Sequence, residues 1–206
     1  MNITPFDFSI YDKLITDIKA QLPAKTPLVL AIDGMCGSGK TTLAQYLCSI
    51  FHAAVIHMDN FFLPFERKTQ KRLAETGGNI DYERFAEIIL PSLLRKEPFS
   101  YIAYNCQTAS YDREIEIKNC ELIIVEGSYS LHEKFGHYYD LSLFLSVDKE
   151  EQLQRLSARC QDEIKFQRFQ KEWIPMEKFY HEQQQVLQRV DLVIDTTSFY
   201  NKFERL

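Results

Sequence analysis

The residues from Gly34 to Thr41, which read GMCGSGKT, are spaced for binding a phosphate group. They fit the pattern G-x-x-x-x-G-K-[S/T], in which glycines let successive backbone N–H groups point at one anion at the start of a helix. Lys40 would reach the β- and γ-phosphates of a nucleotide, and the Thr41 hydroxyl would bind Mg²⁺. Because a chance match in a chain this long is about a one per cent event, we predict a nucleotide-binding loop rather than an ordinary glycine-rich turn.

The loop and the start of the following helix supply all the nucleotide contacts that we predict, with ATP and Mg²⁺ as the bound species. Thr42 can reach the α-phosphate. Cys36 fills a variable position of the loop, and Asp33 is expected to organise the loop rather than to react. The predicted set is Gly34, Cys36, Gly37, Ser38, Gly39, Lys40, Thr41 and Thr42.

Two acidic residues follow apolar runs and are placed for chemistry beside this loop. Asp59 follows AVIHM, and Glu126 follows LIIV. Because the carboxyl ends of strands in a parallel sheet face the ligand site, we predict that Asp59 orients or deprotonates an acceptor hydroxyl. We also predict that Glu126 helps to hold Mg²⁺. The alternatives are a turn-initiating role for Asp59 and a capping or solvent-facing role for Glu126.

Basic residues late in the chain could close over a reacting phosphate. Arg155 and Arg159 share one face of a predicted helix, and Arg168 follows in a polar segment. Since a guanidinium stabilises the charge of a transferring phosphoryl group, we predict a helical lid at approximately 158–175. In it Arg159 would be catalytic, and Arg155 and Arg168 would contact the substrate. The alternative is a solvated helix face on which Glu151 pairs with Arg155.

A second basic cluster lies in the loop after Asp59. It could guide an anionic substrate, although a solvated loop is the simpler interpretation. The cluster consists of Arg67, Lys68, Lys71 and Arg72.

Short apolar runs alternate with segments of helical periodicity, which indicates strands and crossover helices that build a parallel sheet. Aromatic and β-branched residues at 99–104 and 115–118 predict a small inserted β-hairpin. The fold class is therefore α/β, in a single domain spanning 1–206. Strands are predicted at 28–32, 53–58, 122–125, 141–147 and 192–194, and helices at 11–22, 41–51, 149–160 and 176–190, with a further helix beginning near 82.

Composition limits the partners of this chain. Its 206 residues are 45% hydrophobic, which suffices for one sizeable core. A net charge of −5 disfavours a long polyanion such as DNA, and no stretch reaches the roughly 20 apolar residues that span a bilayer. The amino-terminal segment does not fit a signal peptide, and five cysteines without a CxxC pair favour reduced thiols in the cytoplasm. We expect a small-molecule substrate, no nucleic acid and no membrane, and homo-oligomerisation stays open.

Five segments resemble, in order, the uridine kinase family of P-loop kinases: AIDGMCGSGKTT, HMDNFF, GGNIDYERF, IIVEGSYSLH and DLVID. The resemblance covers the chain from about Leu28 to Thr196. It implies a P-loop NTPase fold with a five-stranded parallel sheet wrapped by helices, and transfer of phosphate from ATP to the 5′-hydroxyl of a nucleoside such as uridine or cytidine. It further implies roles for four side chains: catalytic base for Asp59, ribose binding for Asp81, Mg²⁺ binding for Glu126 and nucleobase contact for Tyr104.

Two departures from the family pattern leave the acceptor open. The stretch NCQTAS lacks the histidine that reads a pyrimidine in the family, and Asp162 stands where the family has another lid arginine. The alternatives are a kinase for a ribosyl-pyridine, pantothenate or a sugar phosphate, and a nucleotide-driven switch or ATPase. The sequence has neither an NKxD motif nor an LSGGQ-like segment, which disfavours the switch.

Overall fold

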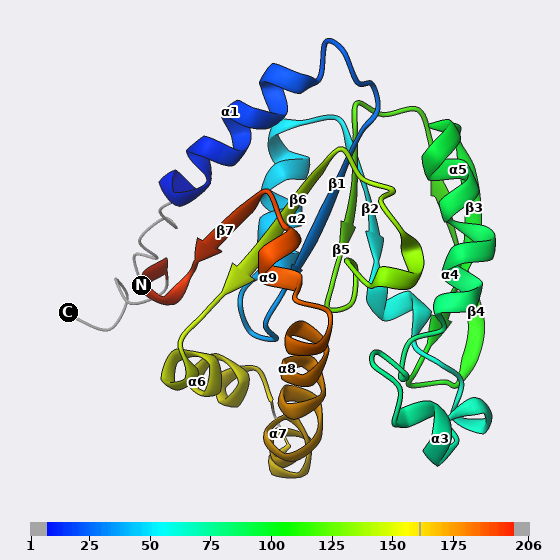
Figure 1. Ribbon diagram of the computed structural model, residues 1–206, viewed down its shortest axis with the longest axis vertical. Helices are drawn as coiled ribbons and strands as arrows, with labels where there is room; N and C mark the ends of the chain where they lie inside the picture. The colour runs from blue at the N-terminus through cyan, green and yellow to red at the C-terminus, as the bar shows by residue number, and fades with distance from the viewer. Residues whose placement is uncertain (1–7, 161, 200–206) are drawn as a thin grey trace.

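The computed structural model describes residues 8–160 and 162–199. Its centre is a parallel sheet of five strands in the order β2-β5-β1-β6-β7, with helices on both faces (Figure 1). The predicted α/β class and five-stranded parallel sheet are therefore confirmed. The strands are β1 (Leu28–Gly34), β2 (Ala53–His57), β5 (Leu122–Glu126), β6 (Leu141–Ser146) and β7 (Leu192–Asp195).

The central strand β1 and its neighbour β5 are buried along their whole length. Their continuous aliphatic character follows from this position, because both faces of a strand in such a sheet are covered. On one face α1 (Asp12–Gln21) and α2 (Lys40–Ile50) pack through residues such as Leu14 and Leu43. On the other face α4 (Tyr82–Ile88) and α8 (Ile174–Gln183) contribute Phe85 and Tyr180 to a second apolar cluster.

The predicted hairpin forms a separate two-stranded antiparallel sheet, composed of β3 (Phe99–Asn105) and β4 (Ser110–Ile117). Its second strand begins at Ser110, before the predicted residue 115. The residues YDRE at 111–114 are exposed, and all but Asp112 pair with β3 across an irregularity in the register, so they carry no apolar signal of a strand. Figure 1 shows the hairpin beside α4 and α5, at the side of the molecule.

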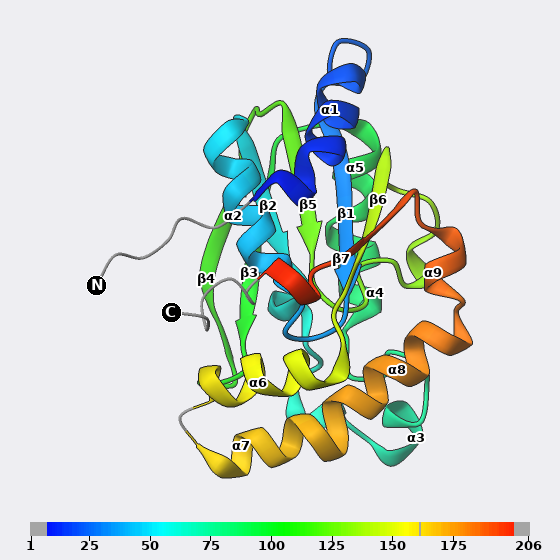
Figure 2. The same ribbon diagram turned by 90° about the vertical axis from the view of Figure 1, so that its left-hand side faces the viewer.

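The helices α6 (Lys149–Arg159), α7 (Glu163–Arg168) and α8 lie together across the end of the molecule to which the central strands point (Figure 2). A π-helical turn, η5 (Phe169–Trp173), joins α7 to α8. The helix predicted at 176–190 starts earlier and ends at Gln183, because Gln185 adopts a left-handed φ of 48° that no α-helix continues. The chain then forms the short helix α9 (Val186–Arg189).

The remaining segments are short and connect the main elements. Within 8–160 and 162–199, no helix has both the length and the apolar character needed to cross a membrane. All five cysteines are free. The short helices are η1 (Phe8–Tyr11), η2 (Met58–Phe61), η3 (Phe65–Arg67), α3 (Gln70–Leu73), α5 (Leu90–Arg95), η4 (Glu133–Phe135) and η6 (Thr197–Phe199).

Candidate active site

The predicted phosphate-binding loop joins β1 to α2 at the carboxyl end of the sheet. Gly34 has a φ of 144°, and a Cβ atom placed there would lie 2.3 Å from the carbonyl oxygen of Leu145 in β6. Gly39 has a φ of 92° at the amino-terminal cap of α2. Only glycine meets both requirements without strain. The structure thus contains the buried strand, glycine turn and helix that a phosphate-binding motif of this type requires.

Lys40 is the first residue of α2 and folds back over the loop. Its ammonium nitrogen donates to the carbonyl oxygens of Gly34, at 2.7 Å, and Met35, at 3.0 Å. An ammonium group has three donors. The charge is therefore held at the loop, where the motif requires it.

Asp33 supports the loop from inside the protein and is fully buried. One carboxylate oxygen accepts from the backbone N–H of Gly34 at 2.7 Å, and the other accepts from the N–H of Leu131 and the hydroxyl of Tyr180. Burial alone would raise the pKa of Asp33, but the interaction with His181, whose Nε2 lies 3.5 Å from Oδ1, and the Tyr180 hydrogen bond lower it. The expectation that Asp33 organises the loop is confirmed.

The carbonyl groups of the loop are held from the side of α6. The amide of Gln152 donates to the Cys36 oxygen at 2.9 Å, and Nη1 of Arg155 donates to the Gly37 oxygen at 3.2 Å. Arg155 also pairs with Glu151 at 2.7 Å, so the predicted pairing is confirmed, but their side chains are only 11% and 8% exposed and do not form a solvated face. Arg155 further donates to Thr196 near the end of β7. Arg155 therefore contacts the loop through the carbonyl oxygen of Gly37. Its predicted contact with the substrate stays a prediction.

The two predicted Mg²⁺ ligands lie side by side. The Thr41 hydroxyl donates to Oε1 of Glu126 at 3.1 Å, so two hard oxygen ligands of the kind that Mg²⁺ prefers meet beside the loop. Within the described residues, no group of three or more His, Cys, Asp or Glu side chains is arranged to hold a metal. A metal ion at this place would therefore take further oxygen ligands from the phosphates and water.

His57, which sequence reasoning assigned no functional role, contacts the same carboxylate. Its Nδ1 lies 2.5 Å from Oε1 of Glu126. The hydrogen bond to Glu126 raises the pKa of His57, against the opposing effect of burial. His57 thus adds a positive charge, when protonated, next to the predicted metal ligand.

Asp59 lies in η2, directly beyond β2, and is solvent-exposed. Desolvation by the surrounding protein atoms and the negative charge of Glu126 raise its pKa, while the positive charges of Lys40 and Arg159 lower it. Because these four groups interact electrostatically, the structure brings together residues that are widely separated in the sequence. Arg159, the last residue of α6, acts on Asp59 through its charge.

Asp81 has a different environment from Asp59. Its side chain is only 1% exposed, caps α4 by accepting from the Arg84 N–H at 3.3 Å, and accepts from Arg67 at 2.6 Å. Arg72 in turn pairs with Glu83 at 2.5 Å. The interpretation of the basic cluster as a merely solvated loop is therefore wrong for Arg67 and Arg72, since both arginines bind acidic groups at the start of α4.

The two remaining predicted substrate residues lie farther along the chain. Tyr104 in β3 is buried, and its ring centroid lies 5.1 Å from that of Tyr111 in β4. Arg168 in α7 is exposed and pairs with Glu172 at 3.3 Å, with its guanidinium 5.0 Å from the centre of the Trp173 ring. Neither contact joins these residues to the phosphate-binding loop, and their predicted roles stay predictions.

One face of α8 contributes site residues that sequence reasoning missed. Glu177 accepts from the N–H of Cys36 at 2.8 Å and from the hydroxyl of Ser128. Tyr180 binds Asp33, and Gln184, at the end of the helix, accepts from the N–H of Glu133. Spacings of three and four residues place these side chains on one helical face. This periodicity of polar and aromatic residues was the available signal.

No protein-family model matches the sequence. The uridine kinase of Ureaplasma parvum serovar 3 is 26% identical over 145 residues, which cover 66% of this chain and 70% of that protein. Uridine-cytidine kinase C of Dictyostelium discoideum is 27% identical over 123 residues, covering 58% of this chain and 27% of the relative.

Two solved structures share the fold. One is described as a possible uridine kinase from Bacillus stearothermophilus, with a TM-score of 0.67, 22% identity, and coverage of 91% of this chain and 100% of that one. The other is a candidate fructose transport system kinase from Silicibacter sp. TM1040, with a TM-score of 0.67, 20% identity, and coverage of 91% of this chain and 99% of that one.

Proposed function

We propose that this chain, which belongs to a uridine kinase-like family of P-loop kinases, transfers the γ-phosphate of ATP to a hydroxyl group of a small molecule. The main support is that Lys40 lies over the phosphate-binding loop and Thr41 contacts Glu126 beside it, while the charges of Lys40, Arg159 and Glu126 all act on the pKa of Asp59. A group that binds phosphate, a group that binds metal and a group that orients an alcohol are the parts that phosphoryl transfer requires.

Each residue has a distinct task in this proposal. The loop N–H groups and Lys40 bind the triphosphate, and Thr41 and Glu126 hold Mg²⁺, which neutralises charge on the phosphate oxygens. Asp59 accepts the proton of the acceptor hydroxyl while the oxygen of that hydroxyl bonds to the γ-phosphorus. The bond from that phosphorus to the β-phosphate oxygen breaks, and ADP leaves. Arg159 stabilises the negative charge that spreads over the transferring group.

The proposed acceptor is the 5′-hydroxyl of a nucleoside such as uridine or cytidine. The names of the relatives and the ordered motifs support this choice. Asp81 and Tyr104 would contact the ribose and the base, and Arg168 would close from the lid. We further propose that the protein works in the cytoplasm, which its five free cysteines support.

The contact between Arg67 and Asp81 favours a second acceptor class. Both Asp81 oxygens have donors, and a guanidinium lies at the place where the family resemblance puts ribose hydroxyls. A guanidinium suits a phosphate or carboxylate group better than a diol. An anionic acceptor such as a sugar phosphate is therefore the alternative that the structure supports most specifically.

A panel of acceptors tests the proposal. Nucleosides, ribosyl-pyridines, pantothenate and sugar phosphates are each offered with Mg·ATP, and ADP release that depends on the acceptor is measured. We expect activity with one class, and we expect Asp59→Asn to lower turnover by about 10²–10⁴-fold while ATP binding stays nearly unchanged. If the rate of ADP release does not depend on any acceptor and is unchanged in Asp59→Asn, an ATPase or a nucleotide-driven switch is favoured instead.

A further inference from the structure

Glu177 joins the lid-bearing helix to the phosphate-binding loop. It lies in α8 and is 8% exposed. Its Oε2 accepts from the backbone N–H of Cys36 at 2.8 Å, and its Oε1 accepts from the hydroxyl of Ser128. The same hydroxyl lies 3.4 Å from the carbonyl oxygen of Gly34, the first residue of the loop. One carboxylate thus connects α8, the loop and the turn after β5.

The burial of this carboxylate demands such partners. A carboxylate removed from water is unfavourable unless donors satisfy its oxygens, and here one backbone N–H and one hydroxyl do so. Its influence on the loop is also electrostatic, because burial and the nearby charge of Glu177 raise the pKa of the Cys36 thiol well above its usual range. Cys36 is therefore a neutral part of the loop rather than an activated thiol.

Two contacts, one turn apart, fix α8 to this region. Tyr180 binds Asp33, the residue before the loop, and Glu177 binds the loop itself. The helix continues back through the π-helical turn that contains Trp173 and into the predicted lid. A displacement of the first half of the loop would therefore be passed to the lid along a continuous helical path. Glu177 is the side chain of α8 that contacts the loop directly.

We propose that Glu177 is a positioning residue for the nucleotide site, which holds the first half of the phosphate-binding loop against α8 and couples nucleotide binding to the lid. This inference rests on the proposed nucleotide-binding function. It assigns no contact between Glu177 and the reacting atoms. The hydrogen bonds of the carboxylate, rather than its charge, perform the task.

Titration with Mg·ADP, followed by the fluorescence of Trp173, tests this inference. Trp173 is the single tryptophan of the chain and lies in the segment predicted as the lid, so its fluorescence reports on that segment without any need for an acceptor. We expect Glu177→Ala to weaken Mg·ADP binding by about tenfold and to reduce the Trp173 response at saturation. Glu177→Gln should restore both, because an amide can accept from the Cys36 N–H and donate to the Ser128 oxygen.

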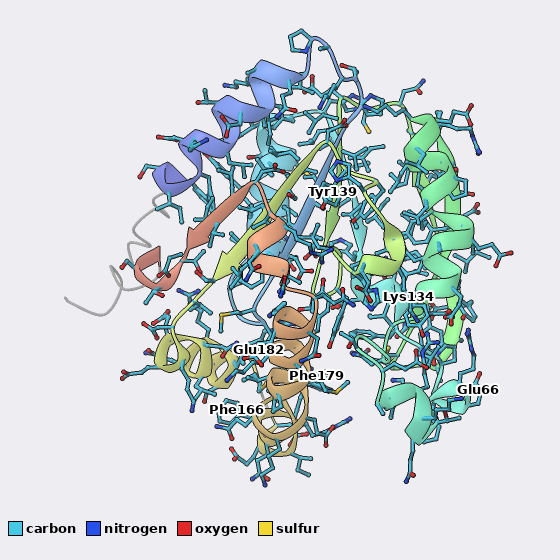
Figure 3. The ribbon with its side chains drawn as sticks, in the orientation of Figure 1. Glu66, Lys134, Tyr139, Phe166, Phe179 and Glu182 are labelled. Atoms are coloured by element: carbon cyan, nitrogen blue, oxygen red, sulfur yellow. The ribbon has the colours of Figure 1, made fainter. Side chains whose placement is uncertain are left out.

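A matched control lies on the same helix. Glu182 is exposed and pairs only loosely with Lys178, at 3.7 Å, and Figure 3 shows it on α8 near Phe179. Glu182→Ala should leave affinity and fluorescence response unchanged. Ser128→Ala removes one of the two hydrogen bonds without altering α8, so it should weaken binding in the same direction even if Glu177→Ala folds poorly.

The outcomes separate this inference from the function on which it rests. If the unmodified protein gives no Mg·ADP binding, the proposed function itself is overturned. If it binds but Glu177→Ala and Ser128→Ala bind equally well or more tightly, Glu177 does not position the loop. If Glu177→Gln is as weak as Glu177→Ala, the charge is what matters, and the hydrogen-bond account is wrong.

Discussion

The hydroxyl of Tyr180 donates a 2.7 Å hydrogen bond to the carboxylate of Asp33, across 147 positions of sequence. Both residues are fully buried. This bond ties α8 to the end of β1, immediately before the phosphate-binding loop. The loop therefore depends on a helix that the chain completes only near its end.

Asp33→Asn should lower the free energy of unfolding by about 1–3 kcal/mol. The buried carboxylate accepts hydrogen bonds through both oxygens, and an amide has no charge and only one accepting oxygen. The lowered pKa of Asp33 means that its ionised form stabilises the fold at pH values above its ordinary 3.8, and that this contribution disappears as the pH falls through the lower folded value. Urea denaturation at several pH values measures both effects. Exposed Glu87→Gln is the control, and equal stability of Asp33→Asn and the unmodified protein would contradict the prediction.

Asp59 should set the acidic limit of activity. Its pKa lies above the ordinary 3.8, because of desolvation first and the charge of Glu126 second. Since a proton acceptor must be ionised, kcat/KM for the acceptor should fall as the pH drops through this raised value, before an ordinary aspartate would be protonated. Arg159→Ala should move the limit to still higher pH, because the charge of Arg159 lowers the pKa of Asp59. An acidic limit at or below 3.8, unaffected by Arg159→Ala, would exclude this assignment.

Thr41→Val should raise the Mg²⁺ concentration needed for half-maximal transfer. The hydroxyl lost from Thr41 is a predicted metal ligand and also donates to Glu126. Loss of a residue that binds a metal ion or supports its ligands typically weakens metal binding by 10-fold or more, so we expect this Mg²⁺ concentration to rise by about 10-fold or more. ATP binding in the absence of Mg²⁺ should change little. Rates measured over a Mg²⁺ titration provide the test. Ser157→Ala, on the exposed side of α6, should follow the unmodified curve, and an identical curve for Thr41→Val would remove Thr41 from the metal site.

Local patterns in the sequence predicted the parts of the site that local structure builds. The strand, glycine turn and helix around Lys40 are consecutive, so their pattern carries the geometry. Asp59 and Glu126 were predicted because both follow apolar runs that form parallel strands, whose carboxyl ends lie at the same end of the sheet. The structure places Glu126 in contact with Thr41 at the end of the loop, and the charge of Lys40 acts on Asp59.

Long-range contacts could not be predicted in the same way. Glu177 meets Cys36 across 141 positions, and nothing in the local sequence of either residue names the other. The partner of Asp81 is another such case, since Arg67 reaches it from an irregular loop. The sequence pattern also failed to predict the strand at 111–114, because these exposed residues, three of which pair with β3, show no alternation of apolar and polar side chains.

Arg155 and Arg159 should differ sharply, although they share one face of α6. Arg155 is largely buried and binds Glu151, the carbonyl oxygen of Gly37 in the loop, and Thr196. Arg155→Ala should therefore lower the free energy of unfolding by about 1–3 kcal/mol, a loss visible in thermal or urea denaturation.

Arg159 is exposed at the end of α6, and its charge acts on Asp59. Arg159→Ala should leave stability within about 0.5 kcal/mol of the unmodified protein but lower kcat by about 10²-fold or more, because charge on the transferring phosphoryl group loses a cation. Measuring stability and kcat for both variants separates the roles. If Arg155→Ala lowers only kcat, or Arg159→Ala lowers only stability, the assignment of one arginine to the loop and the other to the reaction is reversed.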